Sequence, residues 1–176
     1  LLRLRGDAMQ RAVPVGAGLT AVILGLPIEQ VRDICAKTDC DVANDNCPGQ
    51  VVVSGARDVV EATMAAAKES GAKRAMPLAL SVPVHCRIQA PAAEEMRAAL
   101  EKIEIKKPKA ILISNKTAAP MSDPDEIKDA LVYQITHGVH WRESVLKMHE
   151  LGITETIEVG PGAVLTGLTT RICPDM

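Results

Sequence analysis

The alternation of strand and helix patterns over residues 17–85 constrains the fold more than any other feature of this 176-residue chain. Four runs in it have the alternating or β-branched composition of strands, and they are 18–26, 41–46, 50–54 and 72–82. Two runs between them have apolar side chains at helical spacing, and they are 27–37 and 57–70. The resulting order, strand–helix–strand–strand–helix–strand, predicts a ferredoxin-like βαββαβ unit.

The rest of the chain has a different alternation. Residues 1–12 have the spacing of a one-sided helix. Further helices are expected at 92–103, 124–136, 141–151 and from Gly162. Further strands are expected at 110–114 and 154–159. Ser122, with Asp125 three residues later, resembles a capping box at the start of the second of these helices.

Helices that alternate with short buried strands indicate a parallel sheet, so the region after the ferredoxin-like unit has the pattern of an α/β domain. Two strands are too few to form an independent sheet. We therefore expect this α/β domain to be incomplete within the 176 residues.

Charge and aromatic content exclude two classes of partner. The chain has 20 Lys and Arg against 22 Asp and Glu, a formal net charge of −2, and the two signs are interspersed. With no Phe, one Tyr and one Trp, it has no aromatic surface on which bases could stack. Neither nucleic acid nor an anionic membrane is expected as a partner, and no apolar run has the length of a membrane span.

The five cysteines are odd in number and include no C-x-x-C pair; they are Cys35, Cys40, Cys47, Cys86 and Cys173. This pattern indicates reduced thiols in the cytoplasm rather than a disulfide framework or a zinc site. His137, His140 and His149 do not form an H-E-x-x-H motif, so no metal site is expected.

His85 is the most conspicuous candidate for acid–base chemistry, because it stands at the end of the strand pattern in SVPVHC (81–86). A histidine there can be a hydrogen-bonded structural residue or a catalytic base, and the pattern alone leaves both open. Its neighbour Cys86 is not expected to share a proton with it, since successive strand side chains point to opposite faces. Cys86 is interpreted as a small buried apolar residue.

No activated nucleophile accompanies this base. None of the serines lies in G-x-S-x-G, and Ser54-Gly55 has no glycine two residues before the serine. Arg5 is either a solvated surface residue or a clamp that holds a carboxylate with two parallel hydrogen bonds. Gln134 is either a helix-end cap or a residue that orients a neighbour.

Five motifs follow one another along the chain: RGDAMQRAVPVG (5–16), NDNCPGQVVVSG (44–55), GAKRAMPLALSVPVHC (71–86), LVYQITHGVHW (131–141) and EVGPGAVLTGLTTRI (158–172). In this order they resemble the malonyl-CoA:acyl carrier protein transacylases of bacterial fatty-acid synthesis over essentially the whole chain. The resemblance implies an enzyme that moves malonyl from coenzyme A to the phosphopantetheine thiol of acyl carrier protein through an acyl-serine.

The resemblance also assigns roles to the three candidate residues. His85 matches the histidine that serves as general base and then acid, and Arg5 matches the arginine that binds the free carboxylate of malonate. Gln134 matches the glutamine that hydrogen-bonds the histidine and orients it. The family's serine elbow and its G-Q-G-S segment have no counterpart in these residues, so the chain resembles the C-terminal part of the enzyme and is expected to be inactive alone.

The family's fold implies a ferredoxin-like subdomain inserted in an α/β-hydrolase-like domain. The expected boundaries are a large-domain helix at 1–14, the small subdomain at 15–88 and the C-terminal part of the large domain at 89–176. Malonyl-CoA and acyl carrier protein are the expected partners, with no cofactor beyond these substrates. The alternatives are a polyketide-type acyltransferase domain and a non-catalytic fragment that acts as a binding module.

Overall fold

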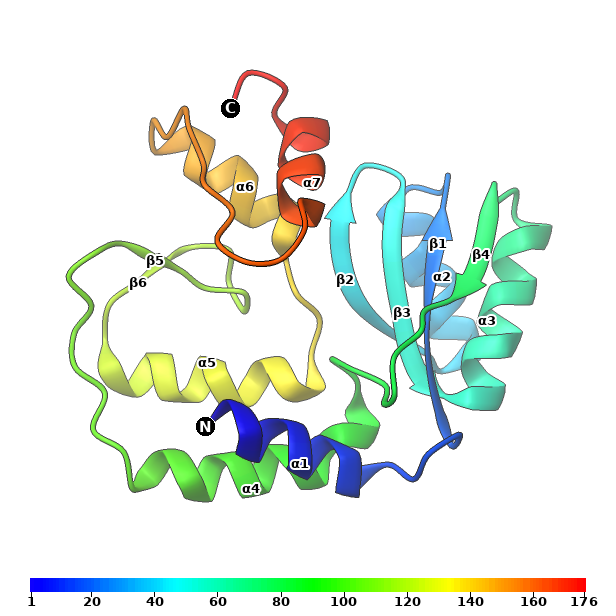
Figure 1. The fold of residues 1–176 in the computed structure, drawn as a ribbon. Coiled ribbons are helices and arrows are strands. Elements are labelled where there is room, and N and C mark those ends of the chain that lie inside the picture. Colours follow the sequence, from blue (N-terminus) through cyan, green and yellow to red (C-terminus); the bar gives the residue numbers. More distant parts are fainter.

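A four-stranded antiparallel sheet forms the centre of one half of the molecule (Figure 1). The computed structural model describes residues 1–176. The sheet and its two helices are β1 (Gly18–Leu24), α2 (Ile28–Thr38), β2 (Asp41–Cys47), β3 (Gln50–Ala56), α3 (Arg57–Glu69) and β4 (Arg74–Pro77). The spatial order is β2-β3-β1-β4, and every neighbouring pair is antiparallel. The chain is therefore an α/β protein with the predicted βαββαβ order.

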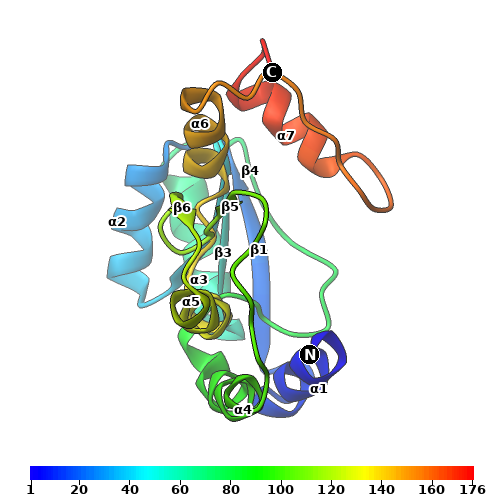
Figure 2. The ribbon, with the colours of Figure 1, turned by 90° about the vertical axis from the view of Figure 1, so that its left-hand side faces the viewer.

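Helices α2 and α3 cover one face of the sheet (Figure 2). Alternate residues of the two central strands, among them Ile23 and Val53, contact Val31 of α2 and Val60 of α3 in one buried apolar cluster. Complete burial of such a side chain contributes about 1.5–3 kcal/mol. The remaining alternate residues, such as Val22, face the opposite side, so the central strands consist of almost continuous apolar runs.

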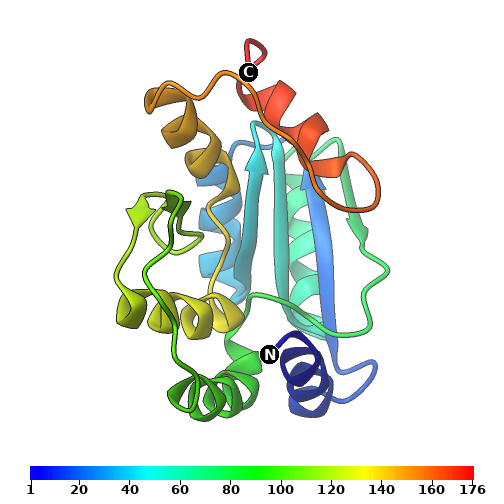
Figure 3. The ribbon, with the colours of Figure 1, turned by 60° about the vertical axis from the view of Figure 1, so that its left-hand side comes forward.

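The second half of the molecule is mainly helical. Its elements are α1 (Leu2–Ala12), the 3₁₀ turn η1 (Arg87–Gln89), α4 (Ala90–Glu101), α5 (Pro124–Thr136), α6 (Trp141–Glu150) and α7 (Val164–Ile172). Helices α1 and α5 both pack on α4, with Met9, Met96 and Ile135 in the shared core. Figure 3 shows α1 and α7 at opposite ends of the sheet face that α2 and α3 leave uncovered. No helix combines the length and the apolarity that crossing a membrane requires.

The segment after α5 is fixed to the edge of the sheet. Val139 forms a single parallel bridge with β2, in which its N–H donates to Ala43 O at 2.9 Å and its carbonyl accepts from Asp45 N at 3.1 Å. The approach is so close that a Cβ at Gly138 would lie 2.4 Å from Val42 O. A residue without a side chain is therefore required there, and the bridge anchors the C-terminal end of α5 beside the sheet.

The two strands expected in the second half form no parallel sheet with each other, in line with a domain that is incomplete within these residues. Only Leu112–Ile113 (β5) of the predicted strand 110–114 is a strand, and it pairs antiparallel with Pro120–Met121 (β6). Residues 154–159 form no strand. A strand exists only where a neighbour receives its backbone hydrogen bonds, and no other segment among these 176 residues pairs with 154–159.

Two local predictions also need correction. The strand predicted over 72–82 ends at Pro77, because β4 is an edge strand that pairs only with β1, and the chain leaves the ladder after Leu78 donates to Thr20 O. Helix α5 is capped by Asp123 rather than Ser122, since the Asp123 carboxylate accepts from the N–H groups of the second and third helical residues.

Candidate active site

His85 lies in an irregular segment between β4 and η1, not at the end of a strand as predicted. Its φ of 55° is in the left-handed region. A non-glycine residue in that region costs about 1–3 kcal/mol, which persists only where the surroundings hold the backbone in place.

The segment before His85 is held against the sheet by packing and one hydrogen bond. Pro83 is fully buried against Gly18 of β1, where a Cβ would lie 2.4 Å from the Pro83 ring. The N–H of Val84 donates to the hydroxyl of Ser54 on β3 at 3.1 Å. These contacts fix the entry of the chain into the His85 turn.

Arg87 fixes the exit of the same turn. Its N–H and its Nε each donate to one carboxylate oxygen of Asp41 on β2, both at 2.8 Å. Its Nη2 also donates to the carbonyl and the carboxylate of Asp39, at 2.6 and 2.9 Å. The backbone is therefore anchored to the sheet on both sides of His85, at Val84 before it and at Arg87 after it. No motif in the sequence indicated this role of Arg87.

The imidazole of His85 is oriented by the end of helix α5. Its Nδ1 lies 2.5 Å from the main-chain carbonyl oxygen of Gln134. The last four carbonyls of a helix have no partner within the helix, so this oxygen is available as an acceptor. A carbonyl only accepts; Nδ1 therefore carries the proton, and Nε2 of the neutral ring has the free lone pair.

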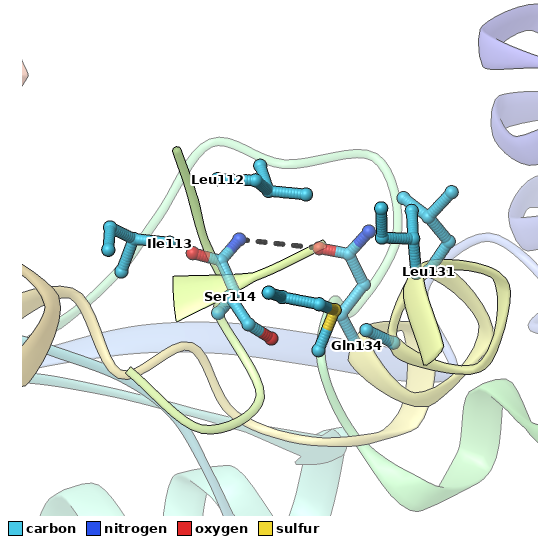
Figure 4. Close-up of a pocket in the computed structure, with 9 residues that line it drawn as sticks. Leu112, Ile113, Ser114, Leu131 and Gln134 are labelled. Atoms are coloured by element: carbon cyan, nitrogen blue, oxygen red, sulfur yellow. Dashed lines mark hydrogen bonds between the residues drawn. The ribbon is translucent and has the colours of Figure 1, made fainter. Parts of the chain in front are cut away.

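The side chain of Gln134 points to a different partner. Its Oε1 accepts from Nδ2 of Asn115 at 3.3 Å (Figure 4). The main-chain oxygen of Asn115 in turn accepts from His140 N at 3.3 Å. Asn115 follows strand β5, and this position at a strand end was the one signal in the sequence that could have identified it.

Gln134 also lines a small cavity of about 100 Å³ in the same region (Figure 4). Apolar side chains such as Leu112, Ile127 and Leu131 contribute most of its lining. His85 does not line it. The cavity therefore lies next to Gln134 and does not open onto the imidazole of His85.

The pKa of His85 is lowered from its ordinary value, chiefly because burial disfavours the charged imidazolium. The carbonyls of Gln134 and His137 act in the opposite direction, and the positive charge of Arg5 lowers the pKa further. The net effect favours a neutral imidazole near pH 7, which is the state in which Nε2 can accept a proton.

Arg5 of helix α1 is close enough to His85 to act on its pKa through its charge. The side chain is half-buried, its Nε is buried without a hydrogen-bond partner, and burial lowers the pKa of the guanidinium. Arg5 forms no ion pair with any carboxylate of the chain. An uncompensated, partly buried guanidinium has the donors and the charge to bind an anion.

The fold thus brings together the three residues that the sequence analysis selected. It brings no nucleophile of the chain to His85, because no serine, threonine or cysteine is hydrogen-bonded to the ring. Cys86 is fully buried, and burial raises the pKa of its thiol to about 11. The interpretation of Cys86 as a buried apolar residue agrees with this environment.

The other polar candidates have structural partners. His137 stacks on the ring of Tyr133 at 3.7 Å, and Nδ1 of His140 lies 2.7 Å from the carboxylate of Glu143. No cluster of histidine, cysteine and carboxylate side chains could hold a metal ion. Glu158, at the start of the EVGPG motif, accepts from the N–H groups of two residues in the first turn of α7.

Comparison with known proteins identifies close relatives of the whole chain. No model of a known protein family matches it. It is 44% identical to the malonyl CoA-acyl carrier protein transacylase of Haemophilus influenzae in an alignment of 180 positions that covers 100% of the chain and 58% of the relative. It is 40% identical to the transacylase of Bacillus subtilis, over 97% of the chain and 56% of the relative.

Solved structures give the same result. The acyl carrier protein S-malonyltransferase of Vibrio cholerae superposes with a TM-score of 0.96 at 44% identity, over 98% of this chain and 58% of that one. A malonyl-transacylase in complex with a type II PKS acyl-carrier protein superposes with a TM-score of 0.95 at 41% identity, over 99% of this chain and 59% of that one. The resemblance predicted from the five motifs is confirmed, and the chain spans a little over half of each relative.

Proposed function

Because this chain is homologous over its whole length to malonyl CoA-acyl carrier protein transacylases, we propose that it supplies the general base and the carboxylate site of such an enzyme. The reaction is the transfer of malonyl from coenzyme A to the phosphopantetheine thiol of acyl carrier protein. The nucleophilic serine would be supplied by residues outside the 176 described here. The whole activity would therefore belong to a protein of the relatives' full length.

One observation carries this proposal. The Nδ1–H of His85 donates to the carbonyl of Gln134, and this orients Nε2 as a neutral base beside an arginine that has no carboxylate partner. This carbonyl takes the role that the aspartate has in a serine triad: it selects the tautomer of the His85 ring and stabilises the imidazolium that forms during the reaction. The negative end of the α5 dipole adds to this stabilisation.

In the first half-reaction Nε2 of His85 removes the proton from the serine hydroxyl. The serine oxygen attacks the thioester carbonyl of malonyl-CoA, and collapse of the tetrahedral intermediate breaks the bond from carbon to sulfur. The imidazolium gives its proton to the leaving thiolate, so that free coenzyme A and a malonyl-serine ester remain. His85 ends this step neutral.

In the second half-reaction the same nitrogen activates the incoming thiol. Nε2 takes the proton of the phosphopantetheine thiol, and the sulfur attacks the ester carbonyl. The serine oxygen leaves and recovers the proton from His85. Malonyl is then bound to the carrier protein as a thioester, and no cofactor takes part beyond malonyl-CoA and the phosphopantetheine of the carrier protein.

Arg5 is the proposed site for the free carboxylate of the malonyl group. A guanidinium can form two parallel hydrogen bonds to a carboxylate, and such charge-assisted bonds contribute about 1.5–3 kcal/mol. An acetyl group has no carboxylate and gains nothing from this contact. Arg5 is therefore the proposed source of the preference for malonyl.

The domain arrangement follows the same proposal. Residues 15–88 would be a ferredoxin-like subdomain, consistent with the strand order β2-β3-β1-β4. Residues 1–14 and 89–176 would belong to a larger α/β-hydrolase-like domain that the remaining sequence completes. The five free cysteines support a cytoplasmic location, where thiols stay reduced.

A polyketide-type transacylase is the second candidate, and it is favoured by one neighbour. The malonyl-transacylase that superposes with a TM-score of 0.95 is bound to a type II PKS acyl-carrier protein. The two candidates share the malonyl donor and the catalytic residues. They differ in the carrier protein that accepts the acyl group.

A transfer assay tests the proposal. The intact protein that carries these residues is mixed with malonyl-CoA and a holo carrier protein, and intact mass detects malonyl on each protein. We expect a malonyl adduct on the enzyme, which disappears as the carrier protein gains the same mass. A carrier protein that stays unmodified by an enzyme with correct fold would contradict the proposal and favour the non-catalytic binding module.

A further inference from the structure

Gln89 places an amide inside the apolar contact between helix α1 and the His85 turn. It is the last residue of η1, its side chain is completely buried, and neither the sequence motifs nor the proposed mechanism uses it. Its Nε2 donates to the carbonyl oxygen of Pro83 at 2.7 Å and to that of Met9 at 3.4 Å. One side chain therefore contacts two backbone segments that are far apart in the sequence.

Each acceptor lies close to one of the proposed site residues. Pro83 is two residues before His85, in the segment that leads into its left-handed turn. Met9 is one helical turn after Arg5 on α1. The amide of Gln89 thus connects the segment that carries the base to the helix that carries the carboxylate site.

Packing alone does not account for an amide at this position. The surrounding core contains Ala8, Met9, Ala92 and Met96, and an apolar side chain of similar length would fill it. The Oε1 of Gln89 is buried and has no hydrogen-bond partner. An unsatisfied buried acceptor costs about 1–3 kcal/mol, so the two donated hydrogen bonds are the feature that distinguishes glutamine from an apolar residue here.

His85 has other supports, whereas α1 has few polar ones. The His85 turn is held by Ser54, Asp41 and the carbonyl of Gln134. Helix α1 is held to α4 by apolar packing and by the exposed pair of Arg11 and Glu95, which is the type of ion pair that contributes about 0–1 kcal/mol. Without the amide, α1 could shift along α4 while His85 stays in place.

We propose that Gln89 is a positioning residue that fixes helix α1, and with it the guanidinium of Arg5, at a set distance from the imidazole of His85. This inference rests on the proposed function, because the distance matters for an acyl group that carries both a thioester and a free carboxylate. Gln89 then contributes to the preference for malonyl without touching the substrate. It is expected to have little effect on an acyl group that lacks the carboxylate.

The test replaces Gln89 with a residue of nearly the same length and volume that cannot donate. In the intact enzyme, Gln89→Met should lower kcat/KM for malonyl-CoA at least about tenfold relative to acetyl-CoA. The matched control is Gln30→Met, which removes an amide-to-carbonyl bond, from Nε2 to Ser70 O, at an exposed position of α2. The control should leave the ratio of the two substrates unchanged.

A second readout does not depend on activity. In the 176-residue chain, NMR titration of the His85 ring should give a higher pKa in Gln89→Met than in the unmodified chain, because the positive charge of Arg5 moves away from the ring. If the unmodified enzyme transfers no malonyl, the proposed function fails, and this titration still tests the positioning role.

The outcomes are distinct. An unchanged malonyl-to-acetyl ratio with an unchanged His85 pKa would overturn the proposal, even if the melting temperature falls. An equal loss on both substrates would also overturn it, since it would assign Gln89 to the general fold. Should Gln89→Met fail to fold, Gln89→Glu replaces it in the test. Below the pKa of the introduced glutamate, its protonated carboxyl group can donate a hydrogen bond to Pro83 O, as the amide does. The preference for malonyl over acetyl should therefore rise as the pH falls.

Discussion

The Nδ1 of His85 lies 2.5 Å from the main-chain carbonyl oxygen of Gln134, and this contact determines which nitrogen of the ring is available for chemistry. The carbonyl is free because it belongs to the last turn of helix α5. The bridge between Val139 and β2 holds that end of α5 beside the sheet on which the His85 turn is anchored. The orientation of the proposed base therefore depends on backbone groups from distant parts of the sequence.

His85 should titrate below its ordinary pKa of 6.5, because burial and the charge of Arg5 outweigh the two carbonyls. Between the lowered pKa of the folded chain and about pH 6.5, His85 binds more protons in the unfolded chain than in the folded chain. The contribution of His85 to the free energy of unfolding is therefore fully present above about pH 6.5 and is lost as the pH falls through the folded pKa. NMR titration of the ring and urea unfolding from pH 5 to 8 measure the two effects. A His85 pKa above 6.5 would contradict the assigned environment.

Arg5→Ala should weaken malonyl transfer by about 10- to 100-fold and leave acetyl transfer nearly unchanged, because only malonyl has a carboxylate for the guanidinium to bind. Steady-state kinetics of the intact enzyme with the two acyl-CoA substrates measure this. Arg3→Ala, on the exposed side of the same helix, is the matched control and should affect neither substrate. An equal loss on both substrates in Arg5→Ala would remove the carboxylate role.

The ion pair between Arg142 of α6 and Asp45 of β2 should respond asymmetrically to mutation. Nε of Arg142 donates to the buried Asp45 carboxylate at 2.8 Å, yet burial raises the pKa of Asp45 despite this partner. Removal of the cation in Arg142→Ala leaves a buried charge without a partner and should reduce the free energy of unfolding by about 3 kcal/mol. Asp45→Asn should change it by less than about 1 kcal/mol, since the neutral amide avoids the desolvation of the charge. Urea unfolding at pH 7 compares the two, and equal losses would contradict the assignment.

Gly138→Ala should destabilise the chain by about 2 kcal/mol or more, because the added Cβ would lie 2.4 Å from the carbonyl of Val42 and the segment must move away from β2. The end of α5 would move with it, so the pKa of His85 should also change. Gly167→Ala in helix α7 is the control: nothing lies within 4 Å of its Cβ, and the greater helix propensity of alanine should stabilise by about 0.5–1 kcal/mol. Equal thermal stabilities for the two variants would refute the close approach.

The sequence predicted the helices best, because a helix forms its hydrogen bonds within its own segment and shows its buried face as a regular period. The prediction for 124–136 has the same bounds as α5, and that for 57–70 differs from α3 by one residue. The strands of the second half failed for the opposite reason. Strand pairing depends on distant neighbours, and the apolar pattern of residues 154–159 carries no information about whether a partner is present.

The sequence selected the residues of the candidate site but could not indicate the contacts between them. His85, Arg5 and Gln134 were selected from motifs, whereas the sequence could not indicate that Gln134 uses its main-chain oxygen, since every residue has one. Asn115, Arg87 and Gln89 contact the site region through hydrogen bonds to segments that are distant in the sequence. Isolated polar residues of this kind follow no periodic pattern.

The central claim, that His85 is the general base of an acyl transfer, is tested most directly by rapid-mixing measurement of coenzyme A release. The intact enzyme and its His85→Ala variant are mixed with malonyl-CoA in the absence of carrier protein. We expect the unmodified enzyme to release a burst of coenzyme A equal to the enzyme concentration, and the variant to release no burst while it keeps its fold by circular dichroism. A burst of unchanged rate and amplitude in His85→Ala would contradict the account.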